Sequence, residues 1–356
     1  MNYIGSKLSL LEFLEDSIKQ VVGEENNKVF CDLFAGTGIV GTYFKKKGFK
    51  IIANDIQYYS YVLNRHYVGN HQILTFSKLV DIIPELKKIQ IKYRKDFVCQ
   101  YLSNLKGKKG FIYNNYCFGG TKNKEVKRLY FSDENGMKCD SIRSKIEEWK
   151  KEKVINENEY FFLLTSLLES IDKKANTASV YGAFLKKLKK SALDSLVLKP
   201  AELIINDQEH DVFNDDINEV VKKVKGDILY LDPPYNHRQY ASNYHMLETI
   251  AKYDNPKIKG KTGLRNYSKQ KSSYCSRPQV KKAFKDLILN AKTKYIFLSY
   301  NNEGLMSLDD IKEIMSLRGK YDFFAKDYSR FKADKTKNRN HKAEKTIEYL
   351  HYVVCN

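Results

Sequence analysis

The residues Asp232-Pro233-Pro234-Tyr235 directly follow the apolar run 227–231. Proline fixes φ and removes a backbone donor, so two prolines end a strand and stiffen the turn after it. The turn places a carboxylate, backbone carbonyls and an aromatic face at the carboxyl end of a sheet, where α/β proteins bind their ligands. These groups suit the activation of a flat, weakly basic amine, such as the exocyclic amino group of a nucleobase.

The chemistry expected at this turn is methyl transfer to an amino nitrogen. The lone pair of the 6-amino group of adenine is delocalised into the ring. If Asp232 and the carbonyl of Pro233 accept its two hydrogens, the lone pair can face an electrophilic methyl group, while Tyr235 stacks on the base. Transfer is then an in-line displacement governed by positioning, and the base must first leave the duplex. The alternative is a rigid turn without a catalytic role.

A second turn, Phe34-Ala35-Gly36-Thr37-Gly38, has the glycines of a ligand-binding loop. Glycine admits positive φ and lets backbone N–H groups approach a ligand closely. Asp55 ends the next apolar run and is placed to accept ribose hydroxyls. Asp32 would repel a pyrophosphate but suits the cationic methionine end of S-adenosylmethionine. The spacing departs from the dinucleotide fingerprint, so an adenosine-type ligand and a purely structural turn both remain open.

The elements that must position these turns fit one sheet interrupted by an insertion. Strands are expected at 29–34, 51–55, 212–214, 227–231, 295–300, 321–328 and 346–354, with helices at 8–22, 39–47 and 58–67. Between them, lysine-rich helical stretches (80–98, 143–152, 160–174 and 184–195) surround an aromatic segment at 107–135. We therefore expect an α/β, Rossmann-like catalytic domain of residues 1–67 and 206–356, with an inserted, mainly helical domain at 68–205.

Charge is distributed unevenly along the 356 residues, whose net charge is +19. Residues 81–200 carry +10 and residues 251–356 carry +13, while residues 201–250 carry −6. Basic stretches around an acidic segment suit a polyanion partner, although a solvated lysine-rich surface has the same composition. The segments 252–285 and 326–345 hold eleven and eight Lys or Arg and are predicted to be mobile loops that contact phosphates.

Several classes of protein are disfavoured. The six cysteines and seven histidines show no metal-ligand spacing, so reduced thiols without zinc or disulfides are expected. No apolar stretch is long enough to span a bilayer. Glu12, Glu15 and Asp16 lie where a secretory signal would be apolar. A cytoplasmic, prokaryotic protein that binds neither a metal nor a membrane is expected.

From end to end, the chain resembles the Dam-like, alpha-group DNA adenine-N6 methyltransferases, many of which are partners of restriction enzymes. Agreement is best at 2–7, 30–41, 51–56 and 212–250. In the alpha group the cofactor residues precede the catalytic turn, and the insertion between them is the target-recognition domain. The resemblance implies S-adenosylmethionine as methyl donor and double-stranded DNA as substrate. It also implies a candidate cognate restriction endonuclease that acts on the same site without necessarily binding this chain.

The resemblance also places roles on individual residues. Tyr3 and Lys7 occupy the cofactor-contacting positions of a short N-terminal loop, although the common Dam pattern has Trp where Tyr3 stands. Asp216, or Asp215 beside it, matches the residue that contacts the cofactor adenine. The candidate catalytic residues are Asp232, Pro233, Pro234 and Tyr235. The candidate cofactor-binding residues are Tyr3, Lys7, Asp32, Phe34, Gly36, Gly38, Asp55, Asp216 and Asp232.

Candidate DNA contacts lie on both sides of the catalytic turn. After it, Arg238 is a candidate phosphate contact, and Tyr240 or Tyr244 a candidate lining of the flipped-base pocket. Within the insertion, Arg128 and Arg143 are the basic candidates.

Two segments of the insertion, 110–116 and 128–132, combine side chains that can read base edges or stack, and a small core with a solvated lysine face is the alternative. His237 and His245 are candidate general bases, but the displaced proton can also leave to solvent.

Three rival functions remain at this point. The first is methylation of the 4-amino group of cytosine or of a guanine 2-amino group in RNA. Cytosine enzymes favour Ser in place of Asp232, and the RNA enzymes generally lack so long an insertion. The second is a non-catalytic DNA-binding relative, against which the intact glycine turn and catalytic turn argue. A small-molecule or protein methyltransferase fits the basic insertion least.

Overall fold

The structure is a computed structural model that describes residues 3–23, 28–329 and 345–356, and these divide into two compact units. We call residues 4–64, 206–241 and 268–356 the sheet unit, and residues 1–3, 65–205 and 242–267 the insertion unit. The long segment of the insertion unit, residues 65–205, overlaps the insertion predicted at 68–205, whose role as a separate domain stays a prediction. Residues 242–267 belong with it, although they follow the catalytic turn in the sequence.

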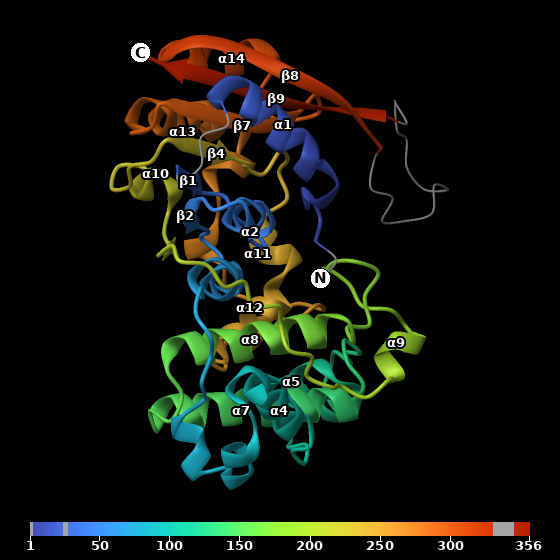
Figure 1. The fold of residues 1–356 in the computed structure, drawn as a ribbon. Helices are drawn as coiled ribbons and strands as arrows, with labels where there is room; N and C mark the ends of the chain where they lie inside the picture. Colours follow the sequence, from blue (N-terminus) through green and yellow to red (C-terminus); the bar gives the residue numbers. More distant parts are fainter. Residues whose placement is uncertain (1–2, 24–27, 330–344) are drawn as a thin grey trace. The chain divides into compact units, whose positions relative to one another are not determined.

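The sheet unit contains a seven-stranded sheet in the order β3-β2-β1-β4-β7-β9-β8 (Figure 1). The strands are β1 (Val29–Asp32), β2 (Lys50–Asn54), β3 (Asp211–Phe213), β4 (Ile228–Leu231), β7 (Tyr295–Asn301), β8 (Gly319–Ser329) and β9 (Lys345–Cys355). The first five strands of this order are parallel, and β9 runs antiparallel to both β7 and β8. This arrangement confirms the predicted Rossmann-like α/β fold. Because β1 has β2 on one side and β4 on the other, the strand order reverses between β1 and β4.

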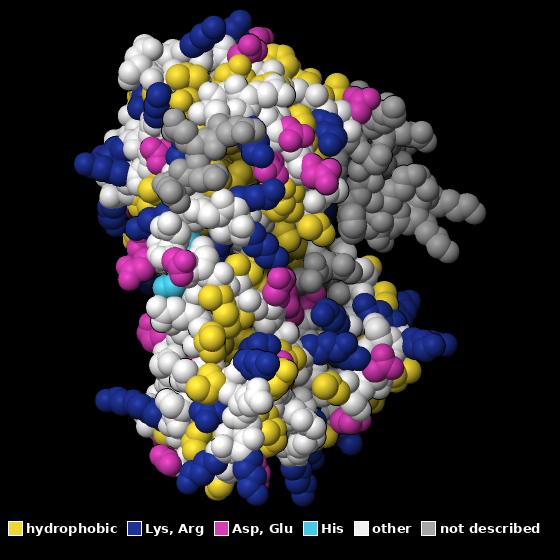
Figure 2. Space-filling view, viewed as in Figure 1, with side chains coloured by type: hydrophobic (Ala, Val, Ile, Leu, Met, Phe, Trp, Pro, Cys, Tyr) yellow, Lys and Arg dark blue, Asp and Glu magenta, His cyan; other side chains and the backbone are white. Residues whose placement is uncertain are grey.

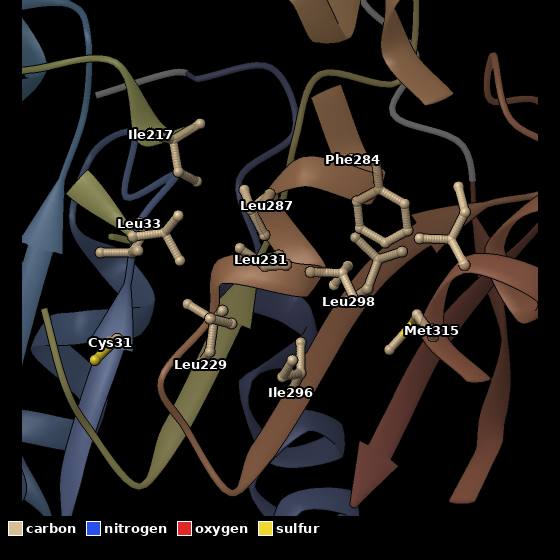
Figure 3. Packing of buried hydrophobic residues seen from close by; sticks show 14 of the residues in the cluster. Cys31, Leu33, Ile217, Leu229, Leu231, Phe284, Leu287, Ile296, Leu298 and Met315 are labelled. Carbon is tan, nitrogen blue, oxygen red and sulfur yellow. The ribbon is translucent and has the colours of Figure 1, made fainter. Parts of the chain in front are cut away.

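Helices cover both faces of this sheet. They are α1 (Leu11–Val22), α2 (Ile39–Lys46), α3 (Tyr58–Asn64), α10 (Ile217–Val220), α11 (Tyr240–Asn243), α13 (Arg277–Asn290) and α14 (Leu308–Ser316), with the short turn η1 (Leu8–Leu10) before α1. On one face, Leu231 and Leu298 pack against Phe284 of α13 and Met315 of α14 (Figure 3). On the other face, Phe30 stacks on Phe44 of α2. Each fully buried apolar side chain of this kind contributes about 1.5–3 kcal/mol.

The central strands are apolar along their whole length because both of their faces are covered. All four residues of β4 are buried, and so are the first six of β7. Continuous burial of this kind is typical of parallel strands between helical layers. The chain becomes polar only where each strand ends, so the functional groups collect at one edge of the sheet.

The insertion unit is mainly helical. Its longer helices are α4 (Ile91–Ser103), α7 (Asp133–Lys151), α8 (Glu157–Asp172) and α12 (His245–Lys252). Its shorter elements are η2 (Arg65–Gly69), η3 (Lys78–Asp81), η4 (Pro84–Lys88), α5 (Phe111–Tyr116), α6 (Phe118–Thr121), α9 (Lys190–Leu193), β5 (Ile258–Lys259) and β6 (Leu264–Arg265). Helices α7 and α8 pack against each other (Figure 1). A capping box between Asn156 and Glu159 starts α8, which satisfies two orphan N–H groups.

Several element predictions were wrong in their limits. The helix expected at 80–98 begins only at Ile91, because Pro84 cannot continue a helix and opens a 3-10 turn instead. The stretch 184–195 is helical only at Lys190–Leu193, since its lysines leave few apolar residues to bury. Helix α7 starts ten residues before the predicted limit, where the Ser132 hydroxyl accepts a hydrogen bond from Asn135 N.

The basic segment 252–285 is not a mobile loop. It contains the β5–β6 hairpin, the 3-10 turns η5 (Ser268–Gln270) and η6 (Ser273–Cys275), and the first part of α13. Most of the second basic segment, residues 330–344, lies outside the described residues. Among the described residues, no helix is long and apolar enough to cross a membrane, and no group of His, Cys, Asp and Glu could hold a metal.

Candidate active site

Acidic residues follow four adjacent parallel strands at the same edge of the sheet. Asp32 is the last residue of β1 and lies opposite Tyr230 of β4, so Asp232 comes two residues beyond that pair. Asp55 follows β2, and Asp216 follows β3 by three residues. The carboxyl ends of β1 and β4 flank the point where the strand order reverses, which is the usual ligand site of such sheets. Its excess of carboxylates favours a cationic ligand.

The turn after β1 is held in a shape that requires glycine. Gly36 and Gly38 have φ of 52° and 77°, and Gly38 N donates to Ala35 O at 2.7 Å. A Cβ atom at Gly38 would lie 2.7 Å from Oδ1 of Asn64, so no side chain fits there. Phe34, at the start of the turn, packs edge-on against Tyr274 with ring centroids 4.9 Å apart. The predicted glycine turn is therefore a tight backbone loop.

Asp55 holds the glycine turn in place and lies at the same edge of the sheet as that turn. Its Oδ2 accepts a hydrogen bond from Gly36 N at 2.9 Å, and its Oδ1 accepts one from Gln57 N at 2.8 Å. A carboxylate oxygen can accept more than one hydrogen bond, so these contacts leave acceptor capacity for a ribose. Asp216 is exposed, and its side chain caps α10 by accepting from Asn218 N.

Two buried asparagines that the sequence analysis missed connect these loops. Asn54 Nδ2 donates to Leu33 O and Asp215 O, both at 3.2 Å, and Asn54 Oδ1 accepts from Asp215 N at 3.1 Å. Asn64 Nδ2 donates to Gly36 O at 3.1 Å. Both side chains are 1% exposed. An asparagine in an apolar strand, such as Asn54 after Ile51-Ile52-Ala53, is the signal that could have identified the first of them.

Asp32 is a buried carboxylate with an unused oxygen. It is 1% exposed, and its Oδ2 accepts from Gly41 N at 3.2 Å, while its Oδ1 has no hydrogen-bond partner among the described residues. Burial, and then the nearby charges of Asp232 and Asp55, raise the pKa of Asp32 to about 8. Leaving a buried acceptor unpaired costs about 1–3 kcal/mol, so a group that brings a donor or a positive charge would be stabilised there.

Asp232 belongs to a buried network with Lys7 and Tyr235. Tyr235 donates its hydroxyl hydrogen to Asp232 Oδ1 at 2.7 Å, and Lys7 Nζ lies 3.2 Å from the same oxygen. Lys7 Nζ also donates to the Tyr235 hydroxyl at 2.6 Å. Burial raises the pKa of Asp232 and so does Glu348, while Lys7 opposes them. The Asp232 side chain is 19% exposed, so part of it stays open to an incoming group.

Two further residues of this network, Ser299 of β7 and Glu348 of β9, were missed by the sequence analysis. Glu348 of β9 accepts hydrogen bonds from Lys7 at 2.8 Å, Tyr235 at 2.9 Å and Ser299 of β7 at 2.7 Å, all on Oε1. Glu348 lies opposite Asn301 in the β7–β9 register. The pairing of β9 with β7 brings it to the catalytic turn across more than a hundred residues of sequence.

The turn at Asp232–Tyr235, which is the candidate catalytic turn, is firmly held. Pro233 is buried and Pro234 half-buried, and Leu305 N donates to Tyr235 O at 3.1 Å. The Tyr235 ring is half-buried and packs edge-on against Tyr300, with centroids 4.9 Å apart. Its hydroxyl therefore points to the carboxylates, and stacking of its ring on a base remains a prediction.

Two of the predicted DNA contacts, Arg143 and Arg128, are buried and bonded within the insertion unit. Arg143 is 1% exposed and donates to Ile250 O and Ala251 O, both at 3.0 Å, besides pairing with Glu147 at 2.9 Å. Arg128 is 7% exposed, and its guanidinium donates to the carbonyls of Gly260, Lys261 and Asn115. Both guanidinium groups hold the backbone of the insertion unit together, so a structural role is the one their contacts support, and the DNA contact stays a prediction.

The remaining candidates differ in accessibility. Arg238 and His237 are exposed, and the Tyr240 hydroxyl donates to Ile4 O at 3.2 Å. Tyr244 is fully buried and stacks on Tyr3 at 4.6 Å, so it lines no open pocket, and the cofactor contact predicted for Tyr3 stays a prediction.

His245 does not meet the requirements of a general base. It is buried, its Nε2 lies 3.0 Å from Tyr181 O, and burial lowers its pKa to about 4.

The predicted base-reading segments form mostly core. Tyr116, Tyr130 and Phe131 are fully buried, as the alternative interpretation of these segments expected. Asp140, 0% exposed, accepts hydrogen bonds from the N–H groups of Gly110, Ile112 and Tyr113 and from the Tyr253 hydroxyl. On the face shown in Figure 2, the described Lys and Arg side chains are spread over the surface with Asp and Glu among them.

Comparison with known proteins identifies the family of the chain. The family model for D12 class N6 adenine-specific DNA methyltransferases matches residues 3–314. Type II methyltransferase M.NlaIII of Neisseria lactamica is 54% identical over 99% of this chain and 98% of its own length. Type II methyltransferase M.FokI of Planomicrobium okeanokoites is 39% identical over 99% of this chain, which spans only 52% of that protein. Type II methyltransferase M.CviAII of Paramecium bursaria Chlorella virus 1 is 36% identical over 94% of this chain and 93% of its own length.

Proposed function

This chain belongs to the D12 class of N6 adenine-specific DNA methyltransferases, and we propose that it methylates adenine within a specific site of double-stranded DNA, with S-adenosylmethionine as methyl donor. Methylation of DNA adenine by this chain follows from the family, and it displaces the rival functions at cytosine, at RNA guanine and as a non-catalytic DNA-binding protein. The observation that carries the finer proposal is the position of Asp232, partly open at the end of β4, next to the glycine turn at the end of β1.

The residues of the sheet unit fit S-adenosylmethionine, which supplies a methyl group on a sulfonium. The unpartnered Oδ1 of Asp32 suits a cationic group, and the Asp55 carboxylate suits ribose hydroxyls. Gly36 and Gly38 leave the backbone open to close approach, and Asp216 at the start of α10 faces solvent where an adenine amino group could donate to it. The four acidic groups Asp32, Asp55, Asp216 and Asp232 make this edge favourable to a positively charged donor.

The proposed chemistry needs little from the protein beyond acceptors and positioning. Asp232 and the carbonyl of Pro233 accept the two hydrogens of the flipped adenine amino group, which frees its lone pair for in-line attack on the methyl carbon. The N–C bond forms as the S–C bond breaks, the electron pair stays on sulfur, and the amino group then loses one proton. Tyr235, fixed through its hydroxyl, offers its ring as a stacking surface.

The biological setting proposed here is restriction–modification. The relatives are named as type II methyltransferases and modification methylases, so methylation by this chain would protect sites from a cognate endonuclease. The insertion at 68–205 is the proposed target-recognition domain. We infer that the protein works in the prokaryotic cytoplasm, where its DNA substrate is found.

The test replaces Asp232 by Asn, which keeps the shape of the side chain and removes its charge. The variant should lose about 100- to 1,000-fold in single-turnover methylation of DNA, because one preorganised electrostatic contact to the amino group is lost. Nucleoside mass spectrometry of the reacted DNA measures N6-methyladenine, and thermal unfolding checks the fold. A folded Asp232→Asn protein with full activity would overturn the proposed site, and 4-methylcytosine as the product would overturn the substrate.

A further inference from the structure

Glu348 is a carboxylate of the network that the proposed chemistry does not use. It lies in β9 and is 4% exposed, in a strand whose other buried residues include Leu350, His351 and Val353. A lone buried carboxylate in such a strand is costly unless its charge is compensated. Here compensation comes from the three donors Lys7, Tyr235 and Ser299, all on one oxygen. Glu348 is therefore built into the network rather than accidentally buried.

Glu348 and Asp232 compete for the same ammonium group. Lys7 Nζ lies 2.8 Å from Glu348 Oε1 and 3.2 Å from Asp232 Oδ1, so the shorter and stronger ion pair is the one with Glu348. Burial opposes the charge of Lys7, but the two carboxylates outweigh it and raise the pKa of Lys7 above its ordinary value. Lys7 thus stays charged, and Glu348 takes the larger share of that charge.

The two carboxylates also compete for one hydrogen. The Tyr235 hydroxyl lies 2.7 Å from Asp232 and 2.9 Å from Glu348, yet it has a single hydrogen to donate. Burial and both carboxylates raise the pKa of Tyr235 well above its ordinary value, so the phenol keeps that hydrogen. When the hydrogen points to Glu348, Asp232 is relieved of a donor, and its lone pairs are available to another group.

We propose that Glu348 is a positioning residue for methyl transfer, which draws Lys7 toward itself and shares the Tyr235 hydroxyl, so that Asp232 remains a strong acceptor for the adenine amino group. This inference rests on the proposed catalytic role of Asp232. Without Glu348, Lys7 and Tyr235 would both turn to Asp232 and weaken it as an acceptor. The nearby groups that set the protonation of Asp232 are Lys7, Asp32, Tyr230, Tyr235 and Glu348, and His351 lies near Glu348.

The test compares single-turnover methylation across pH for the wild type and Glu348→Gln. Gln keeps an acceptor for Lys7 and Ser299 but removes the negative charge. Because Glu348 raises the pKa of Asp232, its neutralisation should lower that pKa and move the acid limb of the rate profile down by roughly one pH unit. The plateau rate should fall about 10- to 100-fold as Asp232 becomes the weaker acceptor, with KM for DNA unchanged.

Two further variants separate the proposed effect of Glu348 from a general effect of removing a buried carboxylate. Glu15→Gln removes another buried carboxylate of the sheet unit, one that pairs with Lys19 and Lys47 at 3.0 Å, and should leave the profile unchanged. Tyr235→Phe removes the shared hydrogen while keeping the ring. Because the hydrogen bond from Tyr235 lowers the pKa of Asp232, this variant should move the acid limb in the opposite direction, toward higher pH.

The inference is overturned if folded Glu348→Gln keeps the wild-type acid limb while Asp232→Asn is inactive. An active Asp232→Asn protein would instead refute the proposed function.

Discussion

Asp32 of the sheet unit and Asp140 of the insertion unit are both buried carboxylates, 1% and 0% exposed, yet their oxygens are used differently. Asp140 accepts four hydrogen bonds from its own unit, at 2.7 to 3.0 Å. Asp32 accepts one, and its second oxygen is left without a partner in the described part of the chain. A saturated buried charge holds a loop in place, whereas a buried charge with spare acceptor capacity is prepared for a ligand.

The same contrast separates the cations of the two units. The guanidinium groups of Arg128 and Arg143 donate hydrogen bonds to backbone carbonyls of the insertion unit. Lys7 is shared between two carboxylates and a phenol, so its contacts can be redistributed. Burial alone therefore does not distinguish a structural charge from a functional one, and the number of satisfied donors and acceptors does.

The largest loss of stability is expected at Asp140, the buried carboxylate whose two oxygens accept four hydrogen bonds. Asp140→Ala should destabilise the protein by about 3–5 kcal/mol, because it leaves several buried N–H groups without an acceptor. Urea unfolding monitored by circular dichroism measures the loss. Asp96→Ala, which removes a half-exposed partner of Lys95, is the control and should cost under about 1 kcal/mol. A small effect at Asp140 would show that saturation does not mark a structural charge.

A smaller effect of opposite sign is expected at Asp32. Its folded-state pKa of about 8 lies above its ordinary value, so its contribution to stability is full below pH 4 and is lost as pH rises toward 8. Asp32→Asn should therefore stabilise the protein at pH 8 by about 1–3 kcal/mol and flatten its pH dependence. Binding of S-adenosylmethionine, measured by calorimetry, should weaken in the same variant. Unchanged binding would remove Asp32 from the cofactor site.

The smallest effect is expected on DNA binding, where exposed Arg238 is compared with buried Arg143. Arg238 is exposed after the catalytic turn, whereas Arg143 is buried. Arg238→Ala should weaken DNA binding a few-fold and reduce the slope of log K against log[salt] by about 1, because one phosphate contact is lost. Arg143→Met should leave that slope unchanged while lowering the melting temperature. Fluorescence anisotropy over a salt series compares the two, and the reverse pattern would support Arg143 as a DNA contact.

The parts of the site that could be predicted from the sequence are those that depend on local chain geometry. Asp232 to Tyr235 and Gly36 to Gly38 are turns at strand ends, and their residue types fix the backbone there. The strands were equally evident, since continuous apolar runs such as Ile228–Leu231 need two covered faces. Local signals therefore located the sheet and the edge that carries the chemistry.

The parts that could not be predicted depend on long-range pairing or on exposure. Glu348 reaches the catalytic turn only through the register of β9 with β7. Arg143 has the charge of a DNA contact but faces two carbonyls of α12, 107 and 108 residues away in sequence. Sequence gives the charge of a residue, whereas its partners follow from the tertiary fold.

Asn54 has a practical consequence for substrate engineering. The amide of Asn54, at the end of β2, bonds the chain just after β1 and just after β3. A change in any one of these three loops would therefore disturb the other two. Enlarging this side of the site for synthetic donors that carry bulkier alkyl groups would disturb all three loops together. Redesign for such labelling reagents should therefore leave the asparagine untouched.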